Sequence, residues 1–94
     1  MTIDFSRGGG LLGRRTRVRL DLETLPAPER KAIEALVDQS AFFSLAEEDV
    51  SRTPDVFDYV VEIEHEGKRH RIHTDDVRAP KTLQPLLEKL RGYL

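Results

Sequence analysis

Three short stretches of the sequence carry residue types that could do chemistry. The first, Gly8-Gly-Gly-Leu-Leu-Gly13, matches the G-x-G-x-x-G pattern of dinucleotide-binding loops. That pattern requires a helix that begins at the last glycine and holds a pyrophosphate at its N-terminus. Residues 14–22 instead alternate in polarity as a strand does, and the chain is too short for a doubly wound sheet. We therefore interpret the stretch as a hairpin loop.

The two leucines of this loop are its unusual feature. Leu11 and Leu12 are bulky and apolar, yet they stand between glycines with little core to join. They either fold under the loop as a lid or are presented to a partner.

The second stretch, His65-Glu-Gly-Lys-Arg-His70, superficially matches a zinc-protease motif. That motif places histidines at i and i+4 on a helix, whereas here the spacing is i+5, with an internal glycine. His70 and His73 lie on opposite faces of a predicted strand, so at most His65 and His70 could converge. The chain has no cysteine, and we expect neither a metal site nor a cofactor.

The third stretch is the carboxylate pair Asp75-Asp76, which could serve acid–base chemistry. Adjacent carboxylates at the end of a strand more often form turns and carry solvated charge. No pocket-lining combination of serine, histidine and aspartate is discernible in the sequence. We therefore predict no catalytic residues and a protein that is not an enzyme.

The element that must position these stretches is a hairpin over Asp55–Asp76. Phe57, Tyr59, Val61 and Ile63 recur at a period of two, which predicts a strand with one buried face. Gly67 suits the tight turn that follows. The predicted register pairs apolar residues on one face and opposite charges on the other: Tyr59 with Thr74, Val61 with Ile72, Ile63 with His70, Glu62 with Arg71, and Glu64 with Arg69.

The remaining elements complete a ββαββα order. Alternation predicts strands over residues 2–6 and 14–22, and apolar stripes predict helices from Pro28 to about Ser40 and from Lys81 or Thr82 to the end. Residues 46–54 are polar, as in a loop or a short helical turn. We predict an α+β fold: a four-stranded antiparallel sheet with both helices packed on its apolar face, forming a single domain over residues 1–94.

Composition and charge exclude several classes of function. Charged residues make up 34% of the chain, and the net charge of −2 does not favour a general nucleic-acid binder. No apolar run approaches the ~18–20 residues of a membrane span. The N-terminus has neither the basic start nor the apolar run of a signal peptide. We expect a cytoplasmic protein that is a monomer when free.

Several arginines on one predicted face of the sheet suggest a nucleic-acid-binding surface, but the other residues of that face argue against it. Arg15, Arg17, Arg19, Arg69 and Arg71 share that face with Glu62 and Glu64. RNA-binding sheets also need exposed aromatic side chains, and we assign Phe5, Phe57 and Tyr59 to the core face. A solvated, salt-bridged surface accounts for this face.

Several pieces of the sequence, in this order and spacing, resemble one family: Ile3-Asp-Phe-Ser-Arg-Gly-Gly9, Arg19-Leu-Asp-Leu22, Phe42-Phe-Ser-Leu45, Pro54-Asp-Val-Phe-Asp-Tyr59, the turn over Gly67–His70, and Ala79-Pro80. The chain is similar to the emfourin family, small bacterial inhibitors of thermolysin-like (protealysin-like) zinc metalloproteases. The resemblance implies an inhibitor without a cofactor that blocks the active-site cleft by tight, reversible binding.

An inhibitor of this kind must block a cleft that contains zinc and favours a large apolar side chain just after the cleaved bond. Leu11 and Leu12 suit that subsite, and Asp75-Asp76 could approach the metal or basic groups around it. The predicted partner-binding residues are Arg7, Gly8, Gly9, Gly10, Leu11, Leu12, Gly13, Asp75 and Asp76. The alternative is a non-inhibitory protein-interaction module that uses the charged sheet face or a strand edge.

Overall fold

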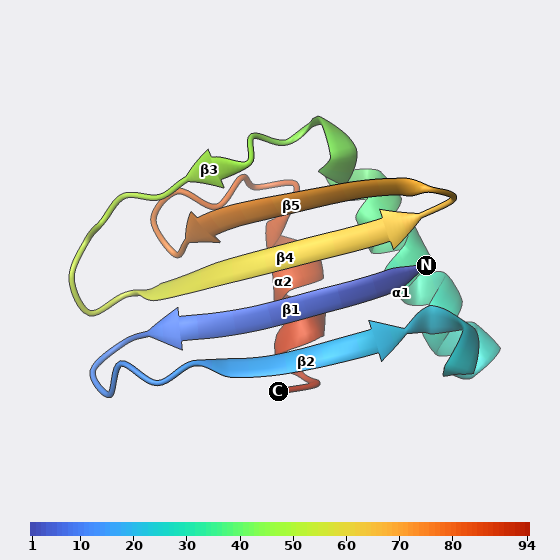
Figure 1. The fold of residues 1–94 in the computed structure, drawn as a ribbon, viewed down its shortest axis with the longest axis horizontal. Helices are drawn as coiled ribbons and strands as arrows, with labels where there is room; N and C mark the ends of the chain where they lie inside the picture. The colour runs from blue at the N-terminus through green and yellow to red at the C-terminus, as the bar shows by residue number, and fades with distance from the viewer.

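A computed structural model describes all 94 residues and places five strands in one sheet, in the order β2-β1-β4-β5-β3 (Figure 1). The strands are β1 (Thr2–Gly9), β2 (Thr16–Asp21), β3 (Glu48–Asp49), β4 (Phe57–His65) and β5 (Lys68–Asp75). The helices are α1 (Ala27–Ser40) and α2 (Gln84–Arg91), with short 3-10 helices η1 (Leu22–Thr24) and η2 (Phe42–Ser44). All neighbouring strands are antiparallel except β3, which runs parallel to β5.

The mixed α+β class with two helices is confirmed, but the prediction of four strands in ββαββα order is wrong. The fifth strand, β3, lies in the segment that we interpreted as a loop or helical turn. It pairs with His73 and Thr74 of β5, and the His73 N–H donates to the Glu47 carbonyl over 2.8 Å. Because β3 has two residues, no alternation could reveal it, and its pairing depends on the exposed edge of β5.

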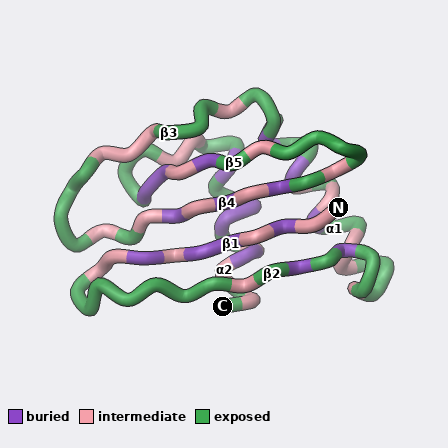
Figure 2. The backbone as a smooth tube through the Cα atoms, in the orientation of Figure 1, coloured by how far each residue is buried: buried purple, intermediate pink, exposed green.

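Both helices lie on one face of the sheet, as predicted (Figure 1). The core fills the space between the helices and the sheet. Buried positions recur among partly buried ones along the central strands β1 and β4 (Figure 2). The buried hydrophobic residues are Ile3, Phe5, Leu20, Leu22, Ile33, Val37, Phe42, Tyr59, Val61, Ile63, Ile72, Leu83, Leu86, Leu87 and Leu90. None of the helices has the length and apolar character that crossing a membrane requires.

The β4–β5 hairpin has the register that the sequence predicts. Ile63 pairs with His70, and Glu64 pairs with Arg69, which donates to the Glu64 carboxylate. Glu66 and Gly67 form the turn with φ values of 51° and 78°. Positive φ at both central residues is typical of the hairpin turn whose twist matches that of the flanking strands.

Neighbouring residues of β4 should respond very differently to truncation. Ile63 is fully buried, so Ile63→Ala leaves a cavity and should lower the free energy of unfolding by about 2–5 kcal/mol. Glu64→Ala is the matched control, since it removes only a solvent-exposed ion pair with Arg69 and should change the free energy of unfolding far less. Urea denaturation measures both, and equal losses would contradict the placement of the core.

Candidate functional site

The glycine loop between β1 and β2 projects from one narrow end of the sheet, away from both helices (Figure 1, left). Leu11 and Leu12 lie at its tip with 89% and 81% of their surface exposed. The structure thus decides between the two alternatives left open by the sequence, because the leucines do not fold under the loop as a lid. They are presented to the solvent.

The backbone of this loop depends on its glycines. Gly9, Gly10 and Gly13 have φ values of 81°, 71° and 61°, in the left-handed region that favours glycine. The Gly10 N–H donates to the Val56 carbonyl over 3.1 Å. A Cβ atom on Gly9 would lie 2.6 Å from that same carbonyl oxygen. The loop is therefore held closely against the segment that leads into β4.

Phe57, the first residue of β4, packs against the glycine loop. Its partner across the β1–β4 pairing is Gly9, and its ring lies so near Gly10 that a Cβ there would approach ring atom Cε1 to 2.9 Å. The Arg7 guanidinium lies 4.5 Å from the ring centroid, within cation–π distance. Leu11, Leu12 and Phe57, flanked by Arg7, form what we call the loop-tip surface.

The placement of Phe57 corrects a prediction. We assigned its side chain to the core face of the sheet with the rest of the β4 alternation, and it lies on that face, but it is 37% exposed instead of buried. The helices do not extend to this end of the sheet (Figure 1), so no helix covers Phe57. The signal available in the sequence was that Phe57 is the terminal member of its series, and terminal members are the least covered.

Asp75 lies in the interior and not on a free surface. Its carboxylate is 2% exposed and accepts four hydrogen bonds: from the N–H and hydroxyl of Ser51 (2.7 and 2.6 Å) and from the N–H groups of Val77 and Arg78 (3.0 and 2.9 Å). Burial by itself raises the pKa of Asp75, but the hydrogen bonds from Ser51, Arg78 and Val77 outweigh it and lower the pKa to about 2. Asp75 is thus unavailable to a partner in this conformation, and it anchors the loop around Ser51.

Asp76 is exposed as a residue, but its carboxylate is also engaged. One oxygen accepts from the Tyr59 hydroxyl over 2.5 Å and the other from the Phe57 N–H over 3.0 Å. Burial of Tyr59, with the hydrogen bond to Asp76 and its negative charge, raises the pKa of the Tyr59 phenol to about 12. Asp76 therefore holds the start of β4, and with it Phe57, in place behind the loop-tip surface.

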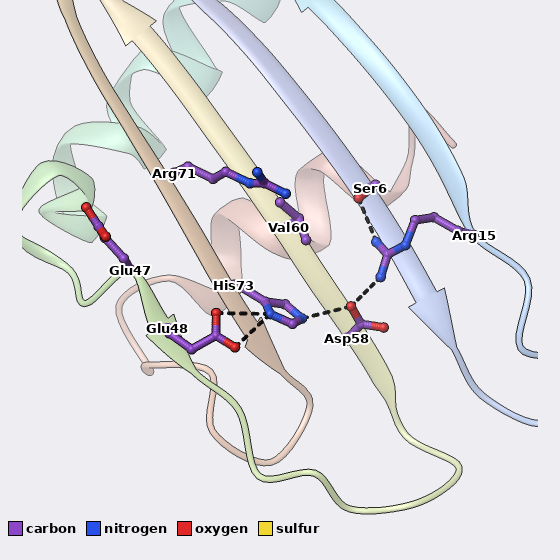
Figure 3. Close-up of a pocket in the computed structure, with 8 residues that line it drawn as sticks. All are labelled: Ser6, Arg15, Glu47, Glu48, Asp58, Val60, Arg71 and His73. Carbon is purple, nitrogen blue, oxygen red and sulfur yellow. Dashed lines mark hydrogen bonds and ion pairs between the residues drawn. The ribbon is translucent and has the colours of Figure 1, made fainter.

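A charged groove lies on the face of the sheet opposite the core (Figure 3). It is lined by residues that the sequence analysis did not group together. Arg15 donates to the Ser6 hydroxyl over 2.7 Å and pairs with Asp58. His73 contacts Asp58 through Nε2 and Glu48 through Nδ1, each over 3.0 Å. These contacts link residues of β1, β3, β4 and β5 with Arg15, which immediately precedes β2.

This groove contains serine, histidine and carboxylates, but not in the arrangement of a nucleophilic enzyme. Nucleophilic catalysis requires a base within hydrogen-bond reach of the serine hydroxyl. Here the Arg15 guanidinium lies between Ser6 and Asp58, while the His73 ring contacts the two carboxylates instead (Figure 3). The network links neighbouring strands of the sheet. It exists because of the order of the strands, which the alternation of residues in the sequence does not reveal.

The remaining histidines have other contacts. His70 Nε2 lies 2.7 Å from the Leu45 carbonyl oxygen, and His65 lies 3.6 Å from the Glu66 carboxylate. No group of three or more histidine, aspartate or glutamate side chains in the structure is arranged to hold a metal ion.

The low pKa of Asp75 makes stability depend on pH in a definite direction. An unfolded aspartate titrates near 4, so the stability contributed by Asp75 is present above about pH 4 and is lost as pH falls towards 2. We expect Asp75→Asn to have a lower free energy of unfolding than the wild type at pH 7. The two free energies of unfolding should converge as the pH falls. Asp38→Asn, at an exposed site, is the control and should follow the wild type. Urea denaturation across this range measures the effect, and parallel curves for wild type and Asp75→Asn would contradict the anchoring role.

Comparison with known proteins identifies the family of the chain. Among models of protein families, Emfourin matches residues 5–91, which include the loop-tip surface and almost the whole sheet. No curated protein and no solved structure matches the chain. The family resemblance noted from the sequence is therefore confirmed, and the chain belongs to the Emfourin family, a family of protease inhibitors.

Proposed function

We propose that this protein inhibits a thermolysin-like, protealysin-like zinc metalloprotease by inserting the loop-tip surface into the active-site cleft. The observation that carries the proposal is the exposure of Leu11 and Leu12, 89% and 81%, on a loop that projects from the end of the sheet. Exposed adjacent leucines mark an interaction site, because burying each in an apolar pocket contributes about 1.5–3 kcal/mol.

The loop would act by occupying space that a substrate needs. One leucine fills the subsite for the large apolar residue that follows the cleaved bond, and the body of the sheet closes the cleft behind it. The zinc ion belongs to the protease, and the inhibitor contributes shape and apolar surface. Asp76 supports the loop in this proposal by holding Phe57, whereas Asp75 anchors the segment around Ser51, and both carboxylates are already hydrogen-bonded within the fold.

The alternative interaction module would use the charged face of the sheet, and the contacts on that face make it the weaker candidate. Three of its five arginines form ion pairs within the fold: Arg17 with Asp4, Arg69 with Glu64, and Arg15 with Asp58. Charges paired within the fold have less to gain from a partner. Binding through this face would weaken strongly with added salt, whereas an apolar loop tip would bind with little dependence on salt.

A titration tests the proposed function directly. Increasing amounts of the purified protein are added to a thermolysin-like zinc protease of the protealysin type while cleavage of a short peptide is followed. We expect activity to fall to a low plateau at one inhibitor per protease, since we propose that the inhibitor acts as a monomer. Unchanged cleavage with micromolar inhibitor would contradict the proposal.

Replacing both leucines tests the part played by the loop tip. Leu11→Ser together with Leu12→Ser should weaken inhibition by ~100-fold or more, because two buried leucines contribute about 3–6 kcal/mol. Leu94→Ser is the matched control, since Leu94 is also an exposed leucine but lies at the C-terminus. Circular dichroism checks that both variants fold. Full potency in the double variant would place the main contact elsewhere.

A further inference from the structure

We propose that Phe57 is a positioning residue that protects the inhibitory loop from cleavage by the very protease that it blocks. This inference rests on the proposed function and deepens it. It concerns how a segment that offers favoured residues to a protease can remain an inhibitor and not become a substrate.

The loop contains bonds that the target would be expected to cut. The Gly10–Leu11 and Leu11–Leu12 peptide bonds are each followed by a large apolar residue, the type favoured after the cleaved bond. Exposed loop tips with small residues are also preferred sites of proteolytic nicking. Resistance to cleavage therefore needs a structural reason.

The conformation of the loop supplies the first part of that reason. A protease binds its substrate as an extended strand, with φ near −120° to −140°. Gly9 and Gly10 precede the leucines with φ of 81° and 71°, and Gly13 follows them with φ of 61°. The leucine side chains are presented while the backbone turns on both sides of them. Cleavage would require the loop to open into an extended form.

The contacts of Phe57 supply the second part, because they hold this conformation. The Phe57 ring packs against Gly10 and also against the Arg7 guanidinium, which lies 4.5 Å from its centroid. Phe57 is itself fixed by two bonds to Asp76: its N–H donates to the carboxylate over 3.0 Å, and its carbonyl accepts from the Asp76 N–H over 3.1 Å. A continuous chain of contacts thus connects Asp76 at the end of β5 to the loop.

Loss of the ring should therefore release the loop and leave the core intact. In Phe57→Ala the Gly10 N–H can still donate to the Val56 carbonyl in the closed form, but the ring that packs against Gly10 and the partner of Arg7 are gone, so the closed form is held less firmly. The extended form becomes more populated, and the protease can act on it. Water adds to the Gly10 carbonyl carbon and the bond to the Leu11 nitrogen breaks. The products are a carboxylate on Gly10 and an amine on Leu11.

The experiment incubates the protease with a stoichiometric amount of each inhibitor and follows intact mass and residual activity over hours. The wild type should remain whole and inhibitory. Phe57→Ala should be cut at Gly10–Leu11 or Leu11–Leu12 at least ~10-fold faster, with activity recovering in step. Phe57→Tyr keeps the ring and should restore resistance. Phe43→Ala is the matched control, because Phe43 is 36% exposed, almost the same as Phe57, and packs near His70 instead of the loop.

Hydrogen exchange of the Gly10 amide gives a second measurement that needs no protease. It should be at least ~10-fold faster in Phe57→Ala than in the wild type, while exchange in the central strands is unchanged. Stable inhibition by intact Phe57→Ala, equal exchange at Gly10, or equal cleavage of Phe43→Ala would each overturn the inference and leave the proposed function standing. Failure of the wild type to inhibit at all would overturn both.

Discussion

The pairing of β1 with β4 is the interaction on which the rest of the structure depends. It joins the N-terminal hairpin to the main hairpin along eight residue pairs, from Thr2 with Glu64 to Gly9 with Phe57. A single two-stranded hairpin is marginally stable, so neither half is expected to persist alone. Pairing the two central strands aligns their buried positions, and Ile3 and Phe5 then lie beside Ile63 and Val61 as one apolar surface for both helices.

The same pairing also creates the loop-tip surface. Because Gly9, which has no side chain, lies opposite Phe57, the loop can pack against the ring at Gly10 while the Arg7 guanidinium of β1 also lies over it. At this end the helices no longer cover the sheet, so Leu11 and Leu12 remain exposed (Figure 1). The sheet is thus covered where the helices pack, and it is exposed at the end where a partner could bind. The Asp76 carboxylate links these two regions, because it accepts from the buried Tyr59 and from the Phe57 N–H at the open end.

The parts of the fold that depend on local periodicity could be predicted from the sequence. The register of the β4–β5 hairpin follows from alternation and charge pairing, and the exposure of the two leucines was one of two alternatives that their glycine neighbours suggested. The parts that depend on contacts between distant segments could not be predicted. The two-residue strand β3 forms only because β5 offers an edge, and the exposure of Phe57 depends on where the helices end.

The carboxylate pair shows the same limit in the candidate site. In the sequence, Asp75 and Asp76 resemble two free charges at the end of a strand. In the fold, Ser51 supplies two of the four hydrogen bonds to Asp75, and Tyr59 and Phe57 both donate to Asp76. These three partners lie well before the carboxylates in the chain. The charged groove around Arg15 likewise exists only because β1 and β5 both flank β4. Contacts with distant segments, together with the local bonds from Val77 and Arg78 to Asp75, give these residues a structural role.

The central claim is that the loop tip, and not the charged face, contacts the protease. Amide chemical shifts of the isotope-labelled inhibitor, recorded by nuclear magnetic resonance with and without the inactivated protease, test it most directly. The account predicts the largest changes at Gly9–Gly13 and Phe57, and their disappearance when a small inhibitor already fills the apolar subsite. Changes concentrated at Arg17, Glu62 and Arg69 on the charged face, with the loop unaffected, would contradict it.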